Sequence, residues 1–325
     1  MTGTKTYLIL IAALMALFSC ENEIDINMDV DGLPVVYCVM DMDDTSQIVR
    51  LAKSFFPEKD YWKYDHIEVK PWDKPVEIYM EEWADPNEAT IYEFSQLDRT
   101  RQDTGYFNTP SYQLYEAIFK PIPNTSYFLY LYFPERNYYT YAQTVSVDHP
   151  MIMDPSNIPG RNITFSDMDD YVVQFRPSLN SEFHQFSFIL NIEEHQADEF
   201  RLDYFDFGSQ IYESNTEQII TNRLSSTRFY KNLTARYDTL SGSDYRRVTS
   251  VEFIIYSYGR EMRLYNQLYN NGTKPWEIQS YTTFVNGTGL FSSVAHDRLT
   301  NLELSKLTLD ILTEDSRYSH MKFIR

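Results

Sequence analysis

The strongest constraint on the fold of this chain is the alternation of apolar and polar side chains over short segments. Val76, Ile78 and Met80 alternate with charged or tyrosine side chains, which is typical of a strand with one buried face. Residues 139–147 alternate in the same way, whereas residues 127–133 are apolar or aromatic at every position. The uninterrupted run predicts a central strand that is covered on both faces. The chain is therefore predicted to be mainly β.

Proline and glycine divide the chain into two halves. Residues 149–161 contain three prolines and a glycine, which interrupt helices and strand ladders. A linker there predicts an immunoglobulin-like β-sandwich at 34–148 and a second β-rich domain at 162–325; a long loop within one domain is the alternative. One or two short helices are expected in the second domain, one near 260–271 and another that begins after Ser305 as its N-cap.

The N-terminal residues 1–19 resemble the signal peptide of a bacterial lipoprotein. Lys5 precedes an apolar run at 7–18, which is shorter than the roughly 20 residues that a membrane span needs. The run ends in Leu-Phe-Ser-Cys20, which resembles a lipobox and implies cleavage before Cys20 and lipid attachment to its thiol. An ordinary secretory peptide with a chance cysteine is the alternative.

Residues 20–33 are expected to form an acidic tether. Glu21, Glu23 and Asp25 follow the cysteine and resemble the surface-export signals of Bacteroidota lipoproteins; a solvated acidic linker is the alternative. Several buried lipid chains hold a protein at a bilayer durably, since each methylene contributes about 0.8 kcal/mol. We therefore expect a lipid-anchored protein of the cell outer membrane that faces the extracellular side.

The charge of the chain and its lack of catalytic motifs argue against nucleic-acid binding and against an enzyme. The chain has 28 Lys and Arg against 47 Asp and Glu, a net charge of −19, which argues against a nucleic-acid partner. It lacks the local motifs of serine hydrolases, zinc proteases and P-loops, and its six histidines never lie two or four residues apart. We predict no enzyme, no metal and no cofactor. A hydrolase site assembled across loops is the alternative, and the acidic stretches 41–44 and 167–170 are interpreted as solvated turns rather than calcium sites.

Aromatic residues are the best candidates for contact with a ligand or partner. The chain has 27 Tyr, 21 Phe and four Trp, and tyrosine and tryptophan favour recognition surfaces. The alternative is that strands are rich in aromatic residues. The candidate contacts are Tyr61, Trp62, Tyr64, Trp72 and Trp83, with Tyr138 and Tyr139 as further exposed positions. Cys38 lies in an apolar segment and is expected to be a buried free thiol.

Separated stretches of the chain resemble a family of Bacteroidota outer-membrane lipoproteins, the domain-of-unknown-function family numbered 4249. Residues 33–40 and 47–55 resemble the opening hairpin of that family. The helix at 262–270, the Pro275-Trp276 step and the sequence Asn286-Gly287-Thr288-Gly289-Leu290-Phe291 resemble its C-terminal part. The resemblance covers roughly residues 20–300.

The resemblance implies an outer-membrane lipoprotein of a kind often encoded beside TonB-dependent transporters. Together with the lipid tether, the β-rich build, the aromatic residues and the absent catalytic motifs, it favours a non-enzymatic accessory or binding subunit of such a transporter or another outer-membrane complex, with a role in nutrient uptake. It supplies no catalytic residues. A stand-alone glycan- or peptide-binding surface module is the alternative function. Asn286, Gly287, Gly289 and Phe291 are interpreted as a structural turn against the helix, because glycine permits a positive φ or a close backbone approach; a ligand loop is the alternative.

Overall fold

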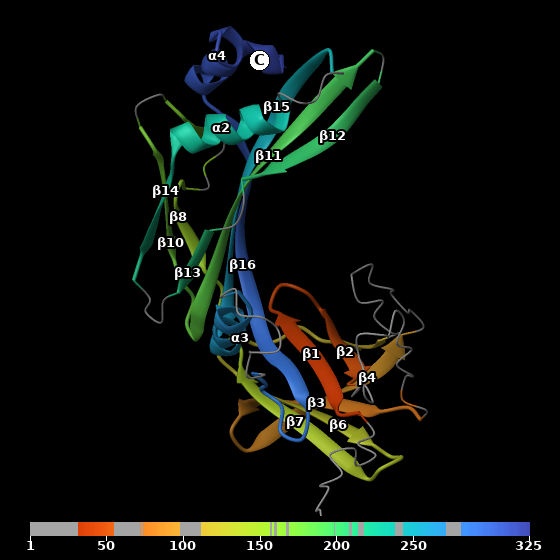
Figure 1. Cartoon of the computed structure of the whole chain (residues 1–325). Coiled ribbons are helices and arrows are strands. Elements are labelled where there is room, and N and C mark those ends of the chain that lie inside the picture. The colour runs from red at the N-terminus through yellow and green to blue at the C-terminus, as the bar shows by residue number, and fades with distance from the viewer. Residues whose placement is uncertain are drawn as a thin grey trace, which may run out of the picture. The chain divides into compact units, whose positions relative to one another are not determined.

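Strands dominate the architecture of the chain (Figure 1). The computed structural model describes residues 32–54, 72, 74–97, 112–156, 158, 161–166, 169–197, 199–207, 210–213, 218–237, 243–270 and 281–325. Apart from Gly32, these residues belong to one unit of the chain, Leu33–Ser54 with His66–Arg325. The prediction of a mainly β protein is confirmed.

The first seven strands all belong to a large mixed sheet, and four of them show a clear alternation of buried and more exposed side chains. In the strand Tyr138–Val145 the phase is opposite to the expected one, because Thr140, Ala142 and Thr144 face the core while Tyr139, Tyr141 and Val145 are exposed. In β3 the side chains of Ile78, Met80 and Glu82 are buried, while those of the intervening residues are not. The strands are β1 (Pro34–Asp41), β2 (Ser46–Lys53), β3 (Glu77–Asp85), β4 (Glu88–Leu97), β5 (Gln113–Ile118), β6 (Ser126–Phe133) and β7 (Tyr138–Val145).

The later strands complete this sheet and form a second, smaller one. The large sheet has fourteen strands, with a main path β12-β11-β15-β16-β1-β2-β5-β4-β3-β6-β7, and the small sheet has the order β14-β10-β8. The added strands of the large sheet are β9 (Asn162–Ile163), β11 (Ser181–Gln196), β12 (Glu199–Asp206), β13 (Gln210–Glu213), β15 (Tyr245–Gly259), β16 (Thr288–Leu304) and β17 (Phe323–Ile324). The small sheet comprises β8 (Met151–Asp154), β10 (Tyr171–Arg176) and β14 (Ile220–Leu224), so a strand lies within the Pro-rich stretch 149–161.

Strand β16 connects the two halves of the large sheet. Its first part pairs in parallel with β1, with Val36 opposite Gly289, and its later part pairs antiparallel with β15. Gly289 has φ +132°, and a Cβ atom there would lie 1.8 Å from the carbonyl oxygen of Val36. Only glycine allows the two backbones to approach so closely.

Three α-helices lie within the described part of the chain: α2 (Ser226–Tyr237), α3 (Arg260–Asn270) and α4 (Lys306–Glu314). A 3₁₀-helix, η3 (Ser319–Met321), follows α4. The predictions of α3 and α4 are confirmed, and the Ser305 hydroxyl accepts a hydrogen bond from the Thr308 N–H at 3.3 Å, as an N-cap does. None of the described helices is long and apolar enough to cross a bilayer.

Helix α2 was missed by the sequence analysis. Its buried side chains include Phe229, Tyr230, Leu233 and Tyr237, which recur at the spacing of one helix face. The strand-like composition of the surrounding residues hid this shorter pattern. The helix packs this face into the core beneath β11 and β15 through contacts such as Phe188–Phe229.

The apolar side chains form two large clusters. One is built from β1–β7 with Phe284 and Phe291, and the other from β8–β11 and β14–β17 with α2 and α4. A small third cluster consists of Met42, Val147 and Ala295. Strand β16 contributes residues to all three. The buried free thiol predicted at Cys38 is confirmed, and burial raises its pKa to about 12.

One cation is buried in the second large cluster. The Arg246 side chain donates to Glu194 Oε1 at 2.7 Å and to the Met321 carbonyl at 2.7 Å, and its guanidinium lies 4.8 Å from the centre of the Tyr237 ring. Arg246 is only 1% exposed. A buried charge needs such partners because its desolvation is costly, so this residue ties β15, β11 and the C-terminal segment together.

Candidate functional site

Strands β3, β6 and β7 present a row of aromatic side chains on the side of the sheet opposite the core. Alternation points every second residue outward, and the strand register places Tyr79 opposite Tyr130 and Tyr130 opposite Tyr141. We call this surface the aromatic face. It consists of Tyr79, Trp83, Phe128, Tyr130, Tyr132, Tyr139 and Tyr141.

The rings of the aromatic face stack across the strands. The ring centres of Tyr79 and Tyr130 lie 4.9 Å apart, those of Tyr130 and Tyr141 6.0 Å apart, and those of Tyr132 and Tyr139 4.4 Å apart. The ring planes in each pair are within 27° of parallel. Such offset pairs are each worth roughly 0.5–1.5 kcal/mol beyond their buried area. The face is therefore an ordered surface rather than a set of independent side chains.

This face remains accessible at its two ends. Tyr139 is 50% exposed, Tyr141 41% and Trp83 39%, whereas the rings between them are half-buried by one another. Strand β6 was predicted to be covered on both faces. That prediction is wrong for the outer face, whose side chains are only partly buried. They are covered by the aromatic rings of the neighbouring strands and not by a second layer of the protein.

Two hydroxyl groups of the face, those of Tyr79 and Tyr130, have raised pKa values and act as neutral hydrogen-bonding groups. Burial, followed by the nearby Glu81 carboxylate, raises the pKa of Tyr79 and of Tyr130 above the ordinary tyrosine value. Glu81 also accepts a hydrogen bond from the Trp83 indole at 3.1 Å. Beside the rings, Glu77, Glu81 and Glu93 line a shallow hollow. The face thus combines apolar rings and hydroxyl donors with a negative charge.

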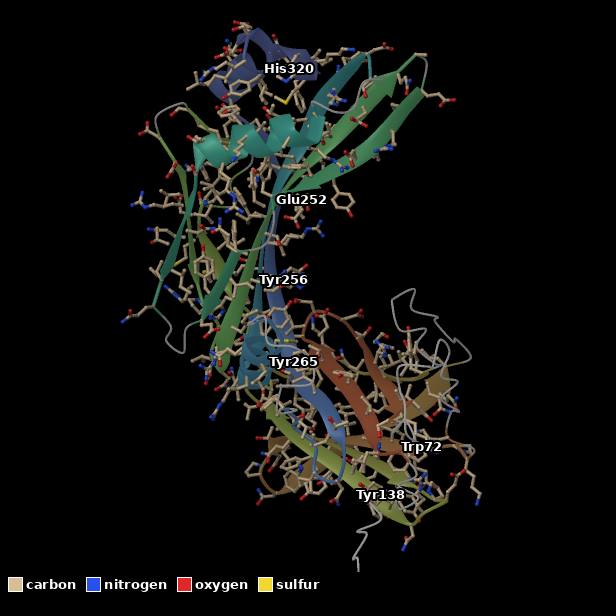
Figure 2. The ribbon with its side chains drawn as sticks, viewed as in Figure 1. Trp72, Tyr138, Glu252, Tyr256, Tyr265 and His320 are labelled. Carbon is tan, nitrogen blue, oxygen red and sulfur yellow. The ribbon has the colours of Figure 1, made fainter. Side chains whose placement is uncertain are left out.

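Of the tryptophans chosen from the sequence, Trp83 belongs to the aromatic face and Trp72 does not. Trp72, labelled in Figure 2, is 6% exposed. Its ring centre lies 4.5 Å from that of Phe133, and the charged ends of Lys53 and Arg136 lie over the indole. Its expected role as a surface contact is corrected to a core role, because three flanking groups cover the indole. The other candidates, Tyr61, Trp62 and Tyr64, lie outside the described residues, as do Cys20, Glu21, Glu23 and Asp25.

The turn motif that leads into β16, Asn286 to Phe291, contacts the neighbouring strands. The Tyr138 hydroxyl donates to the Asn286 carbonyl, and a Cβ at Gly287 would lie 2.6 Å from Thr140 Oγ1. Phe291 is fully buried in the first large cluster. These contacts place the turn against β7 and β1, whereas the sequence analysis expected it against the helix.

Sequence reasoning missed most of the aromatic face. Tyr79, Phe128, Tyr130, Tyr132 and Tyr141 were visible as alternate residues of three strands. The missing information was the register, because a strand pattern does not say which other strand lies beside it. A search for outward-facing aromatic residues on consecutive strands would have found those of β6 and β7, but not Tyr79, because β3 is separated from β6 by two strands.

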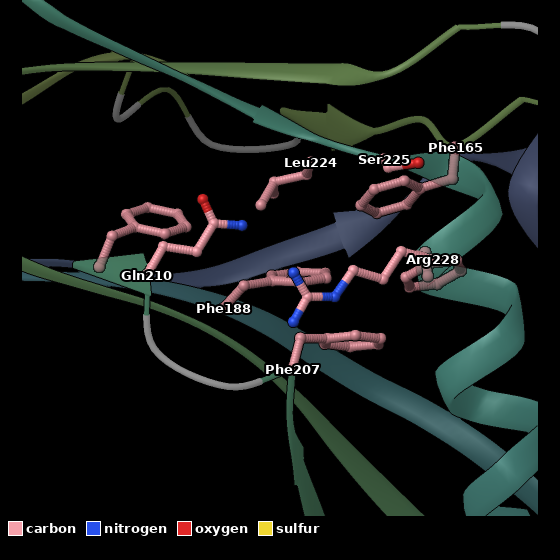
Figure 3. A pocket seen from close by; sticks show the side chains of 9 residues that line it. Phe165, Phe188, Phe207, Gln210, Leu224, Ser225 and Arg228 are labelled. Carbon is pink, nitrogen blue, oxygen red and sulfur yellow. The ribbon is translucent and has the colours of Figure 1, made fainter. Parts of the chain in front are cut away.

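An apolar pocket lies at the edge of the second large cluster (Figure 3). Its lining is mostly phenylalanine, and Arg228 reaches over it from α2. The ring centres of Phe165 and Phe229 are 4.0 Å apart and those of Phe188 and Phe207 are 4.6 Å apart. Because these rings already pack against one another, we interpret this pocket as the edge of the hydrophobic core and not as a ligand site.

The described residues include one set of side chains with metal-ligand chemistry. Carboxylate oxygens of Asp41 and Asp43 and a ring nitrogen of His296 lie within 4.8 Å of one another. The second acidic stretch is only partly described, and there Asp170 accepts a hydrogen bond from the Ser226 N–H at 3.2 Å. His184, by contrast, is fully buried and shares a 2.9 Å hydrogen bond with Ser257.

Comparisons with known proteins leave the family open. No protein-family model matches the chain, and no curated protein is significantly similar to it. Among solved structures, Spo0M, a sporulation control protein from Bacillus subtilis, is 12% identical with a TM-score of 0.18 over 51% of this chain, which spans 52% of that chain.

Two further solved structures match at a similar level. The calcium binding domain CBD12 of CALX1.1 is 10% identical with a TM-score of 0.18, over 80% of this chain and 98% of that one. The C-terminal globular domain of an oligosaccharyltransferase from Pyrococcus abyssi is 9% identical with a TM-score of 0.20, over 84% of this chain and 50% of that one. Similarities this distant say nothing about function.

Proposed function

We propose that this chain is a non-enzymatic, surface-exposed lipoprotein of the outer membrane that binds a partner protein through the aromatic face. The partner is a TonB-dependent transporter or another outer-membrane complex, to which the chain serves as an accessory subunit. The observation that carries the proposal is the ordered row of stacked, partly exposed rings on β3, β6 and β7. The lipobox-like sequence that ends at Cys20 and the resemblance to lipoprotein family 4249 support the location.

The geometry of the rings favours a protein partner over a sugar. A sugar ring binds against an open aromatic face, but here the faces of Tyr79 and Tyr130 cover each other. Ring edges and hydroxyls remain, and these suit the polar and aliphatic groups of a protein surface. Glu77, Glu81 and Glu93 beside them select a partner with Lys or Arg side chains, which also bind aromatic rings.

We also propose the finer division of the fold into an immunoglobulin-like sandwich at 34–148 and a β-rich domain at 162–325. The separation of the apolar side chains into two large clusters supports it, and the second domain completes the first cluster with Phe284 and Phe291. In this arrangement the aromatic face belongs entirely to the first domain, and the second domain is free to contact other components of the complex.

The proposal is tested by affinity capture of the tagged lipoprotein from native outer membrane in mild detergent, followed by mass spectrometry. We expect one β-barrel protein in stoichiometric amount. A Y139S/Y141S variant should capture it at least about tenfold less well, since central interface residues contribute about 2 kcal/mol or more. Both tyrosines are substantially exposed, so the variant should fold.

The matched control is Tyr204→Ser, which removes a tyrosine that is 70% exposed on β12, away from the aromatic face. It should capture the barrel as the unchanged protein does. Equal capture by all three proteins, or capture of no barrel, would overturn the docking proposal. Glycan binding that the Y139S/Y141S variant loses, without a captured barrel, would instead support a stand-alone glycan-binding module.

The anchoring is tested separately. Cys20→Ala should leave the protein outside the membrane fraction, and its retention there would contradict lipid attachment. Replacing Glu21, Glu23 and Asp25 by Ala should keep the anchor but remove access to protease added to whole cells. Unchanged protease access would contradict the export signal while leaving the anchor intact.

A further inference from the structure

Two histidines from distant parts of the chain meet at one aspartate. His149 Nε2 lies 3.0 Å from Asp43 Oδ1, and His296 Nδ1 lies 2.7 Å from Asp43 Oδ2. The Asp41 carboxylate completes a group whose oxygen and nitrogen atoms, with those of Asp43 and His296, are within 4.8 Å of one another. The chain has only six histidines, so the meeting of two at one carboxylate is a marked concentration.

The backbone positions of these residues are held by a small buried cluster. Met42, Val147 and Ala295 pack together, and each lies one or two residues from one of the converging side chains. The Met42 N–H donates to the Val294 carbonyl at 2.9 Å, which fixes the β1–β2 turn to β16. The donor groups are therefore arranged by the fold before any ligand binds, which lowers the cost of binding one.

The donor set selects the kind of ion. Calcium and magnesium prefer six or more oxygens, whereas imidazole nitrogen together with carboxylate oxygen suits zinc and its neighbours among the divalent transition metals. Asp41, Asp43 and His296 offer three mutually close ligand atoms, and His149, 3.0 Å from Asp43, is the candidate for the fourth position of a tetrahedral zinc site.

The surroundings of the histidines agree with this chemistry. Asp148 Oδ1 lies 3.6 Å from Nδ1 of His149, on the side of the ring away from Asp43, and a carboxylate beside the second ring nitrogen is typical of metal-binding histidines. The ring of Tyr256, labelled in Figure 2, lies 5.6 Å from that of His296 and limits its rotation.

We infer that Asp41, Asp43, His149 and His296 form a binding site for a divalent transition-metal ion, with zinc as the best-fitting member of the class. The ion would join the β1–β2 turn, the segment after β7 and strand β16 at the third cluster. It is a structural clamp in this proposal, and it is independent of the aromatic face.

The experiment uses the full chain purified with a tag that contains no histidine and stripped of metal with a chelator. Co²⁺ is the spectroscopic probe, because its visible absorption reports tetrahedral nitrogen and oxygen ligands, and Zn²⁺ is then used to displace it. We expect one equivalent of Co²⁺ to bind and one equivalent of Zn²⁺ to replace it. At a zinc concentration about a hundredfold above the Kd, Tm should rise by about 4 °C.

Single variants identify the site. His149→Ala, His296→Ala and Asp43→Asn should each weaken zinc binding at least about tenfold. The side chains of His149 and His296 are 39% and 32% exposed, so these variants should fold, which their Tm without metal will show. The matched control is His195→Ala, because His195 also lies near a carboxylate, 3.4 Å from Glu193, but shares it with no other histidine of the described residues.

The outcomes separate this proposal from its alternatives. Retention of zinc affinity in His195→Ala together with its loss in His149→Ala and His296→Ala supports the site. Absence of saturable binding by the unchanged protein means that the cluster is a set of ion pairs only, and it overturns the proposal. Tight binding that survives both histidine substitutions places the metal elsewhere and overturns it as well.

Discussion

Removal of the buried guanidinium at Arg246 should destabilise the protein far more than removal of an exposed one beside the same carboxylate. Arg246 donates to Glu194, to the Met321 carbonyl and to Ser243 Oγ, the last at 3.2 Å. In Arg246→Ala, Glu194 loses its nearest cation, and its side chain is only 11% exposed. Removing one member of a buried ion pair costs about 3–5 kcal/mol, and the exposed Arg201, 3.7 Å from Glu194, can replace little of the lost interaction.

The exposed comparison is Arg201, whose guanidinium lies 3.7 Å from the same Glu194 and is 69% exposed. Arg201→Ala should cost less than about 1 kcal/mol, because water and salt already screen this pair. Urea unfolding at pH 7, followed by tryptophan fluorescence, measures both variants against the unchanged protein. The difference in the free energy of unfolding should exceed about 2 kcal/mol.

A double substitution tests the cause. Arg246→Met with Glu194→Gln removes both charges and keeps most of the volume, so it should be more stable than Arg246→Met alone. The explanation fails if Arg246→Ala and Arg201→Ala cost the same. It also fails if Glu194→Gln brings no recovery, because the loss would then come from packing alone.

Three further predictions concern other parts of the fold. In a Cys20→Ser protein, Cys38 should not react with a thiol reagent at pH 8 until the protein unfolds, because burial raises its pKa to about 12; rapid reaction of the native state would contradict this. Ser305→Ala should lower the free energy of unfolding by about 1 kcal/mol through loss of the α4 N-cap. An unchanged urea midpoint would show that the hydrogen bond from the Thr308 N–H to the Ser305 hydroxyl does not stabilise the protein. Burial raises the pKa of Glu261, although the Thr144 hydroxyl, 3.2 Å away, opposes the shift by donating a hydrogen bond to the carboxylate. The folded state therefore favours the protonated carboxyl group. Its contribution to the free energy of unfolding is complete below about pH 4.3, the pKa in the unfolded chain, and is lost as the pH rises through the higher pKa of the folded state. Glu261→Gln should remove that part of the pH dependence in urea unfolding, and an unaltered profile would refute it.

The sequence predicted those strands and helices that are determined by side chains close together in the chain. The alternation at Val76, Ile78 and Met80 predicted β3, and the Ser305 hydroxyl marked the start of α4. Both depend on side chains within a few residues of one another. The burial of Trp72 was not predictable in this way, because the ring that covers it belongs to Phe133 on β6.

The candidate sites depend on contacts between distant segments, and for that reason they could not be predicted from the sequence. The aromatic face needs the register of β3, β6 and β7, which no single strand encodes. The absence of closely spaced histidines led to the prediction of no metal, yet His149 and His296 approach the same Asp43 from distant segments of the chain that meet at the third cluster.

The parallel pairing of β1 with β16 has a consequence for how the chain reaches its folded state. The paired residues Val36 and Gly289 are about 250 residues apart, and contacts this distant in sequence slow folding because a very long loop must close. The first hydrophobic cluster contains Phe291, so it stays incomplete until nearly the whole chain is available. A chain synthesised from its N-terminus therefore completes its fold late, and any chain that stops before β16 leaves both large clusters open to chaperones and proteases.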